Sequence, residues 1–167
     1  MNSSEKKIGH FIILHLGKDQ FAINVMKVKE ILELSKITEV PESPHYLRGI
    51  VNLRGSLLSV VDLRAKFGLE VVEDTPKTRI VVLDIESKQE HFTVGVIVDQ
   101  VTDVIEFDEA QIQIPTDMED YKKAAYIKGM MHIQEDFIML IDIDKVFSSS
   151  EASLFGENTL PEDVAEE

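Results

Sequence analysis

The chain has 167 residues, with 31 Asp plus Glu against 17 Lys plus Arg, a formal net charge of -14 and no cysteine. This charge repels phosphate backbones and anionic lipid, so we expect no nucleic-acid partner. The longest apolar run near the start, residues 11–14, is far shorter than the roughly 18 residues of a spanning helix, so we expect no direct membrane insertion. The absence of cysteine excludes disulfides and thiolate metal sites and fits a cytoplasmic protein.

After an N-terminus expected to be flexible (residues 1–8), short apolar runs alternate with turn signals. The expected strands are FIILHL (11–16), FAINV (21–25), KEILEL (29–34), GIVNL (49–53) and SLLSVVDL (56–63). Five short strands in about 60 residues predict a small closed barrel, because closure removes exposed strand edges. Between Val25 and Leu32 the apolar spacing also allows a helical turn.

The second part of the chain repeats the first. Residues 126–147 align without a gap to residues 46–67, and VTDVIEF (101–107) matches VKEILEL (28–34). Further upstream, residues 92–94 match residues 21–23. We therefore predict two homologous five-stranded halves, 9–68 and 78–147, joined by a connector at 69–77. The acidic tail at 148–167 is expected either to be a disordered, solubilising end or to dock through Leu154 and Phe155.

Residues that recur in both halves are candidates for roles in the fold. Tyr46, Gly49 and Asp62 recur as Tyr126, Gly129 and Asp142. Each Asp ends an apolar run before a short helical segment, so we expect both to cap helix N-termini. The alternative is an enzyme that uses Asp62 and Asp142 as an acid/base pair.

Residues that do not recur are candidates for partner binding. Arg54 lies at a predicted hairpin tip and corresponds to Gln134, and Arg64 corresponds to Asp144. A guanidinium at such a tip presents a planar fork of donors to another molecule. The alternative is an internal salt bridge, which applies also to Arg64 and to Arg48. Arg79 has no counterpart and no assigned role.

Motifs for chemistry are absent from the sequence. The histidines are scattered without the spacing of metal ligands, and no nucleotide-binding or nucleophile motif is present. We therefore expect no metal, no cofactor and no catalysis. The five histidines are His10, His15, His45, His91 and His132.

Residues 40–68, VPESPHYLRGIVNLRGSLLSVVDLRAKFG, closely resemble the signature of CheW-type chemotaxis coupling proteins. The resemblance extends to residues 25–34 and 94–107 and covers about residues 10–147 as one CheW-like domain. It implies a mainly β fold of two intertwined five-stranded SH3-like barrels with short helical segments. It also implies a cytoplasmic, non-catalytic adaptor, recruited to receptor arrays, that joins chemoreceptor tips to the regulatory domain of the histidine kinase CheA. An adaptor of another sensory array, such as one for pili or surface sensing, is the alternative.

The resemblance also implies binding residues. Arg54, the arginine of NLRG, would face the receptor's helical hairpin. Val28, Glu30, Gly95 and Val101 match receptor-binding positions along the groove between the barrels, and Val25 is a candidate for the kinase-facing surface. For the three valines, ordinary burial in the core is the alternative.

Overall fold

The computed structural model of the chain describes residues 7–87, 90–114 and 125–155. The first half contains β1 (Ile8–Leu16), β2 (Asp19–Asn24), η2 (Val25–Lys27), β3 (Val28–Glu33), β4 (Leu47–Leu53), β5 (Ser56–Asp62) and α1 (Leu63–Lys66). The second half contains β6 (Arg79–Ser87), β7 (Glu90–Val98), β8 (Gln100–Asp108), η3 (Glu109–Gln111), β9 (Ile127–Ile133), β10 (Asp136–Ile141) and η4 (Ile143–Lys145), followed by α3 (Ser149–Phe155). No helix in the described residues is both long and apolar enough to cross a bilayer.

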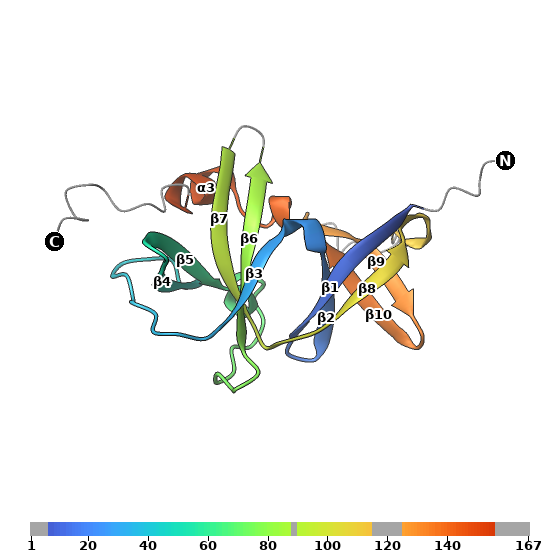
Figure 1. Cartoon of the computed structure of the whole chain (residues 1–167), viewed down its shortest axis with the longest axis horizontal. Coiled ribbons are helices and arrows are strands. Elements are labelled where there is room, and N and C mark those ends of the chain that lie inside the picture. The colour runs from blue at the N-terminus through green and yellow to red at the C-terminus, as the bar shows by residue number, and fades with distance from the viewer. Residues whose placement is uncertain (1–6, 88–89, 115–124, 156–167) are drawn as a thin grey trace.

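The ten strands of the described residues form two five-stranded sheets that exchange strands between the halves (Figure 1). Sheet A has the order β8-β1-β2-β10-β9, and sheet B has the order β3-β6-β7-β5-β4. Each sheet thus contains two strands of one half and three of the other. Equivalent strands of the two halves occupy the same positions in the two sheets. The mainly β fold with two five-stranded units is confirmed, and the units are intertwined, as the resemblance implied.

Strand register corrects one part of the internal alignment. Ala22 pairs with Leu140 and Gly95 pairs with Val60, and Leu140 and Val60 are equivalent residues of the two halves. Ala22 is therefore equivalent to Gly95, so residues 21–23 match residues 94–96 and not 92–94. The predicted alignment of this segment was wrong by two residues, because the second half is longer than the first within the β6–β7 hairpin. Leu14 pairs with Phe21 while its equivalent Leu83 pairs with Val94, which makes this hairpin four residues longer.

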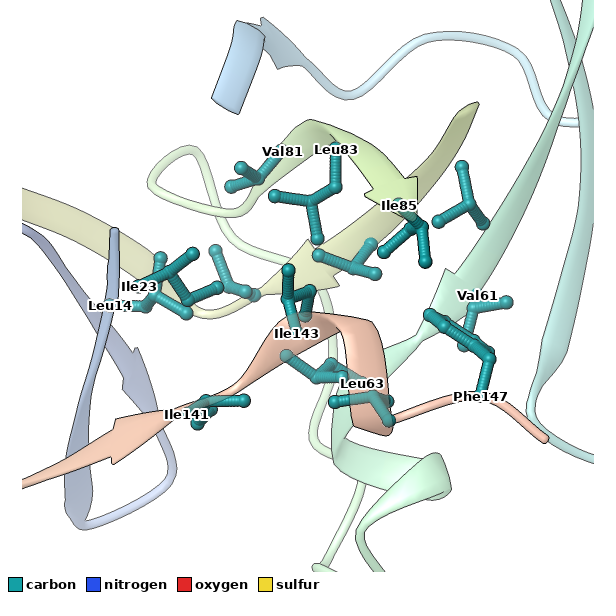
Figure 2. Close-up of a cluster of buried hydrophobic side chains, with 14 of the residues drawn as sticks. Leu14, Ile23, Val61, Leu63, Val81, Leu83, Ile85, Ile141, Ile143 and Phe147 are labelled. Atoms are coloured by element: carbon teal, nitrogen blue, oxygen red, sulfur yellow. The ribbon is translucent and has the colours of Figure 1, made fainter. Parts of the chain in front are cut away.

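Alternating side chains build three apolar clusters. On β1, Ile12 and Leu14 join the largest cluster, which lies between the two sheets (Figure 2), whereas Phe11 and Ile13 join a cluster formed by sheet A alone. A third cluster is formed by sheet B alone. Because successive strand residues point to opposite faces, each sheet contributes apolar side chains to one cluster on each of its two faces. The cluster between the sheets therefore joins the two halves into one core.

The recurring residues have identifiable roles in the fold. Asp62 accepts a hydrogen bond from the Arg64 amide at 3.0 Å, and Asp142 accepts one from the Asp144 amide at 3.2 Å, which confirms both helix caps. At Gly49 a Cβ atom would lie 2.2 Å from the carbonyl oxygen of Thr38. Glycine is needed there because the chain after β3 approaches β4 closely, at the Thr38–Ile50 bridge.

Helix α3 corrects the expectation of a disordered tail for residues 149–155. Phe155 is 1% exposed, and its ring centroid lies 5.7 Å from that of Phe147. Glu151 accepts hydrogen bonds from the Tyr46 hydroxyl and from Lys66 Nζ, the latter at 2.6 Å. Phe155 thus docks into the protein's own core, whereas Leu154 is exposed. Residues 156–167 lie outside the described residues.

Candidate functional site

The β4–β5 hairpin presents Arg54 at its tip. Arg54 and Gly55 both have positive φ, +52° and +88°, as two-residue hairpin turns require. The Asn52 side chain accepts a hydrogen bond from the Gly55 amide at 2.9 Å. The Arg54 side chain at this turn is 71% exposed.

The guanidinium of Arg54 is held by Glu30 through two hydrogen bonds of 2.8 and 2.7 Å. Glu30 lies on β3 and Arg54 follows β4, so the pair joins the two edge strands of sheet B. Its hydrogen bonds raise the pKa of Arg54 and hold the pKa of Glu30 below its usual value. Arg54 is therefore both internally paired and outward-facing.

A hollow of about 470 Å³ lies beside this pair. Its lining includes the apolar side chains of Leu53, Leu58 and Val82 together with the charged side chains of Lys29, Glu30 and Arg54. Lys29 also donates a hydrogen bond to Thr93 on the neighbouring hairpin, at 3.4 Å. An apolar lining with charges gathered beside it suits a protein segment that carries both apolar and polar side chains.

The remaining predicted receptor-binding residues are packed to different degrees. Val28 and Val101 are half-buried against the cluster between the sheets, at equivalent positions opposite Leu83 and Leu14. Gly95 is buried in β7, where a Cβ atom would lie 2.8 Å from Ile80 Cγ2. The structure thus brings Arg54 and Glu30 into direct contact but gives Val28, Val101 and Gly95 positions that pack the fold.

Val25, predicted to face the kinase, begins the short helix η2. The helical turn and the strand that the sequence allowed for residues 25–32 are both present, because the η2 turn leads directly into β3. Val25 is half-buried, and the next residue, Met26, is 84% exposed. Sequence reasoning missed Met26, which could have been found as a large apolar residue between Val25 and Lys27 at a strand junction.

The other two arginines of the signature stabilise the fold. Arg64 is fully buried and donates hydrogen bonds to Asp62 at 2.9 Å and to Asp99 at 2.6 Å. These carboxylates, Asp62 first, raise the pKa of Arg64. Arg48 pairs with Asp74 of the connector, which also lies 3.6 Å from Arg64. The internal salt bridges expected as the alternative for both residues are present.

Arg79 and the two capping aspartates carry no catalytic arrangement. Arg79 donates hydrogen bonds to the carbonyl oxygens of Pro76 and Thr78. Asp62 and Asp142 cap different helices and line different hollows. An acid/base pair requires two carboxylates that face one reacting group, so this geometry does not favour the enzyme alternative.

One histidine lies beside two carboxylates although the sequence showed no metal-ligand spacing around it. The β6–β7 hairpin brings Asp84 and Glu86 beside His91. Residues five and seven apart show no ligand spacing on a helix. Only the pairing of two strands reveals their proximity, and the hairpin register was the missing signal.

Comparison with known proteins agrees with this architecture. Residues 10–151 match the family model of the CheW-like domain. The chemotaxis protein CheW of Rhizobium meliloti is 32% identical over 140 residues, covering 84% of this chain and 88% of the relative. CheW of Bacillus subtilis is 37% identical over 115 residues, covering 66% and 69%. The crystal structure of the scaffolding protein TtCheW from Thermoanaerobacter tengcongensis superposes with a TM-score of 0.74 at 26% identity, covering 85% of this chain and 94% of that one. The chain therefore belongs to the CheW-like family of chemotaxis adaptor proteins.

Proposed function

We propose that the chain is a non-catalytic cytoplasmic adaptor, recruited to receptor arrays, that binds chemoreceptor tips through Arg54 and the regulatory domain of a CheA-type kinase through a separate surface. The observation that carries the receptor part is the geometry of Arg54, which is outward-facing yet held by Glu30. The relatives named above are chemotaxis proteins and a scaffolding protein, which supports this assignment.

The pair with Glu30 leaves Arg54 able to bind a partner. A guanidinium has five N–H donors, and Glu30 accepts from two of them, so three remain. Because the side chain is already ordered, binding loses less conformational entropy than it would with a free arginine. The remaining donors suit carboxylate and carbonyl oxygens of a receptor helix.

The hollow beside Arg54 would accept an apolar side chain of the same helix. Leu53, Leu58 and Val82 supply apolar surface there. Interfaces commonly combine a buried apolar centre with a polar rim, and arginine is enriched among their strongest contacts. In this proposal Glu30 positions Arg54, and Gly95 and Val101 support the wall and the core beneath it.

Kinase binding would use the surface around η2. Val25 and the exposed Met26 lie at the junction of β2 and β3. A partner bound there would remove the Met26 side chain from water, which favours association. We expect Val25→Asp to weaken binding of the kinase domain without weakening binding of a receptor fragment.

The test measures binding of the purified chain to a receptor-tip fragment and, separately, to the kinase regulatory domain. Arg54→Glu should weaken receptor binding at least tenfold and leave kinase binding unchanged. Gln134→Glu, at the equivalent tip of the other half, is the matched control and should change neither. Equal losses in the two variants, or no binding of either partner by the wild type at tens of micromolar, would contradict the proposal.

A further inference from the structure

The β6–β7 hairpin carries a group of charged and titratable side chains to which the proposed adaptor function assigns no role. Glu86 lies directly opposite His91 in the register, and Asp84 lies two residues before Glu86, opposite Thr93. Residues two apart on a strand, and residues directly opposite across a ladder, share one face. Asp84, Glu86 and His91 therefore project from the same face of the hairpin.

These three residues are close enough to share one ion. Their candidate donor atoms all lie within 4.8 Å of one another, and His91 already contacts Asp84 through its Nε2 atom. Neighbouring ligands of a tetrahedral zinc ion are separated by roughly 3.4 Å at bond lengths of about 2.1 Å. Glu86 and His91 are exposed, so small side-chain rotations bring the donors to that separation, and water can complete the coordination.

The donor set selects a class of metal. One imidazole and two carboxylates offer a nitrogen and oxygens with two negative charges. Imidazole favours zinc and other transition metals, whereas magnesium and calcium prefer oxygen ligands alone. Lys27, whose charge also acts on Asp84 and Glu86, is engaged by Asp144 at 2.8 Å.

We propose that Asp84, Glu86 and His91 form a binding site for a divalent transition-metal ion, with Zn²⁺ as its representative. The bound ion links β6 to β7 near the end of the hairpin. His91 also belongs to the lining of the hollow beside Arg54, so the ion stiffens one wall of that hollow. This last consequence rests on the proposed function, whereas metal binding itself does not.

The test titrates the full chain, without an affinity tag, with ZnCl₂ and separately with MgCl₂ by isothermal calorimetry. We expect one Zn²⁺ per chain with a Kd in the micromolar range and at least tenfold weaker binding of Mg²⁺. At a free Zn²⁺ concentration ten times Kd, linkage should raise the Tm by about 3 to 6 °C.

His91→Ala and Asp84→Asn should each weaken Zn²⁺ binding at least tenfold, with Glu86→Gln as a milder third variant at an exposed position. His10→Ala is the matched control. His10 pairs with Glu106 alone, at 3.2 Å, and belongs to no such cluster among the described residues, so its removal should not affect binding. The proposal is overturned if Zn²⁺ does not bind up to about 1 mM. It is overturned equally if the folded hairpin variants bind like the wild type, or if Mg²⁺ binds as tightly as Zn²⁺.

Discussion

The tips of the two equivalent hairpins, β4–β5 and β9–β10, share a positive φ at the first turn residue but differ in chemistry. The second turn residue has a positive φ at Gly55 but not at its equivalent, Glu135. Arg54 and Gln134 occupy the same position and have φ values of +52° and +56°. The acid on the third strand is kept, as Glu30 in one half and Asp103 in the other. Because the turn forms in both halves and the cation is present in only one, the fold requires the turn but not the cation. This difference is the basis for assigning Arg54 to a partner.

At a second pair of equivalent positions, Arg64 and Asp144, the sign of the charge is reversed between the halves. Both residues nevertheless make a salt bridge to the other half. Arg64 of the first half reaches Asp99, at the β7–β8 junction of the second half, at 2.6 Å. Its equivalent, Asp144, reaches Lys27, at the β2–β3 junction of the first half, at 2.8 Å. The halves thus hold each other through two bridges of reversed polarity, one buried and one partly exposed.

The largest expected loss of stability distinguishes the buried salt bridge from the partly exposed one. Arg64→Met leaves the Asp62 and Asp99 carboxylates without their buried cation and should reduce the free energy of unfolding by about 3 to 5 kcal/mol. Asp144→Asn removes a partly exposed pair and should cost about 1 kcal/mol or less. Urea denaturation of both variants measures the difference. Similar losses would show that burial does not distinguish the bridges.

The next effect compares the equivalent small residues Gly95 and Ala22. A Cβ atom at position 95 would lie 2.8 Å from Ile80 Cγ2, so Gly95→Ala should cost about 1 to 3 kcal/mol through overpacking. Ala22→Gly creates no clash and should cost about 1 kcal/mol. Thermal and urea unfolding test both. A Gly95→Ala variant of wild-type stability that no longer binds the receptor fragment would make position 95 a contact and not a packing site.

The smallest expected loss of stability concerns α3, which has no equivalent in the described part of the first half. The Tyr46 hydroxyl donates a hydrogen bond to Glu151 of this helix. Burial raises the pKa of Glu151, but hydrogen bonds from Lys66, the Ser148 amide and Tyr46 outweigh it, so the pKa is lowered. A lowered pKa in the folded state gives stability that is present above the unfolded value of 4.5 and is lost as the pH falls through the folded value. Glu151→Gln should therefore lower the Tm at pH 7 and flatten its decline between about pH 5 and pH 3. Parallel Tm curves for the two proteins would contradict the role of Glu151.

Sequence patterns predicted the strands, the repeat and both helix caps, because local turn chemistry and alternation determine them. The exchange of strands between halves did not follow from the repeat, since five strands in each half fit separate units equally well. The burial of Phe155 was hidden by the acidic residues around it. Sequence also left open which arginine is buried and which is exposed. That difference depends on partners such as Asp99 and Glu30, which lie 35 and 24 residues away.

The central claim is that Arg54 binds a partner and does not merely join the edges of sheet B. Exchanging the charges in the double variant Glu30→Arg, Arg54→Glu keeps an internal ion pair at the same place, so the edges remain joined. The receptor-facing cation at position 54 is then replaced by a carboxylate.

The decisive measurement is receptor-fragment affinity together with the Tm for the wild type, Arg54→Glu and the charge-exchanged double variant. We predict that the double variant recovers a Tm within about 2 °C of the wild type. Its receptor binding should remain at least tenfold weaker. Recovery of wild-type affinity by the double variant would show that Arg54 serves only the internal pair and would contradict the account.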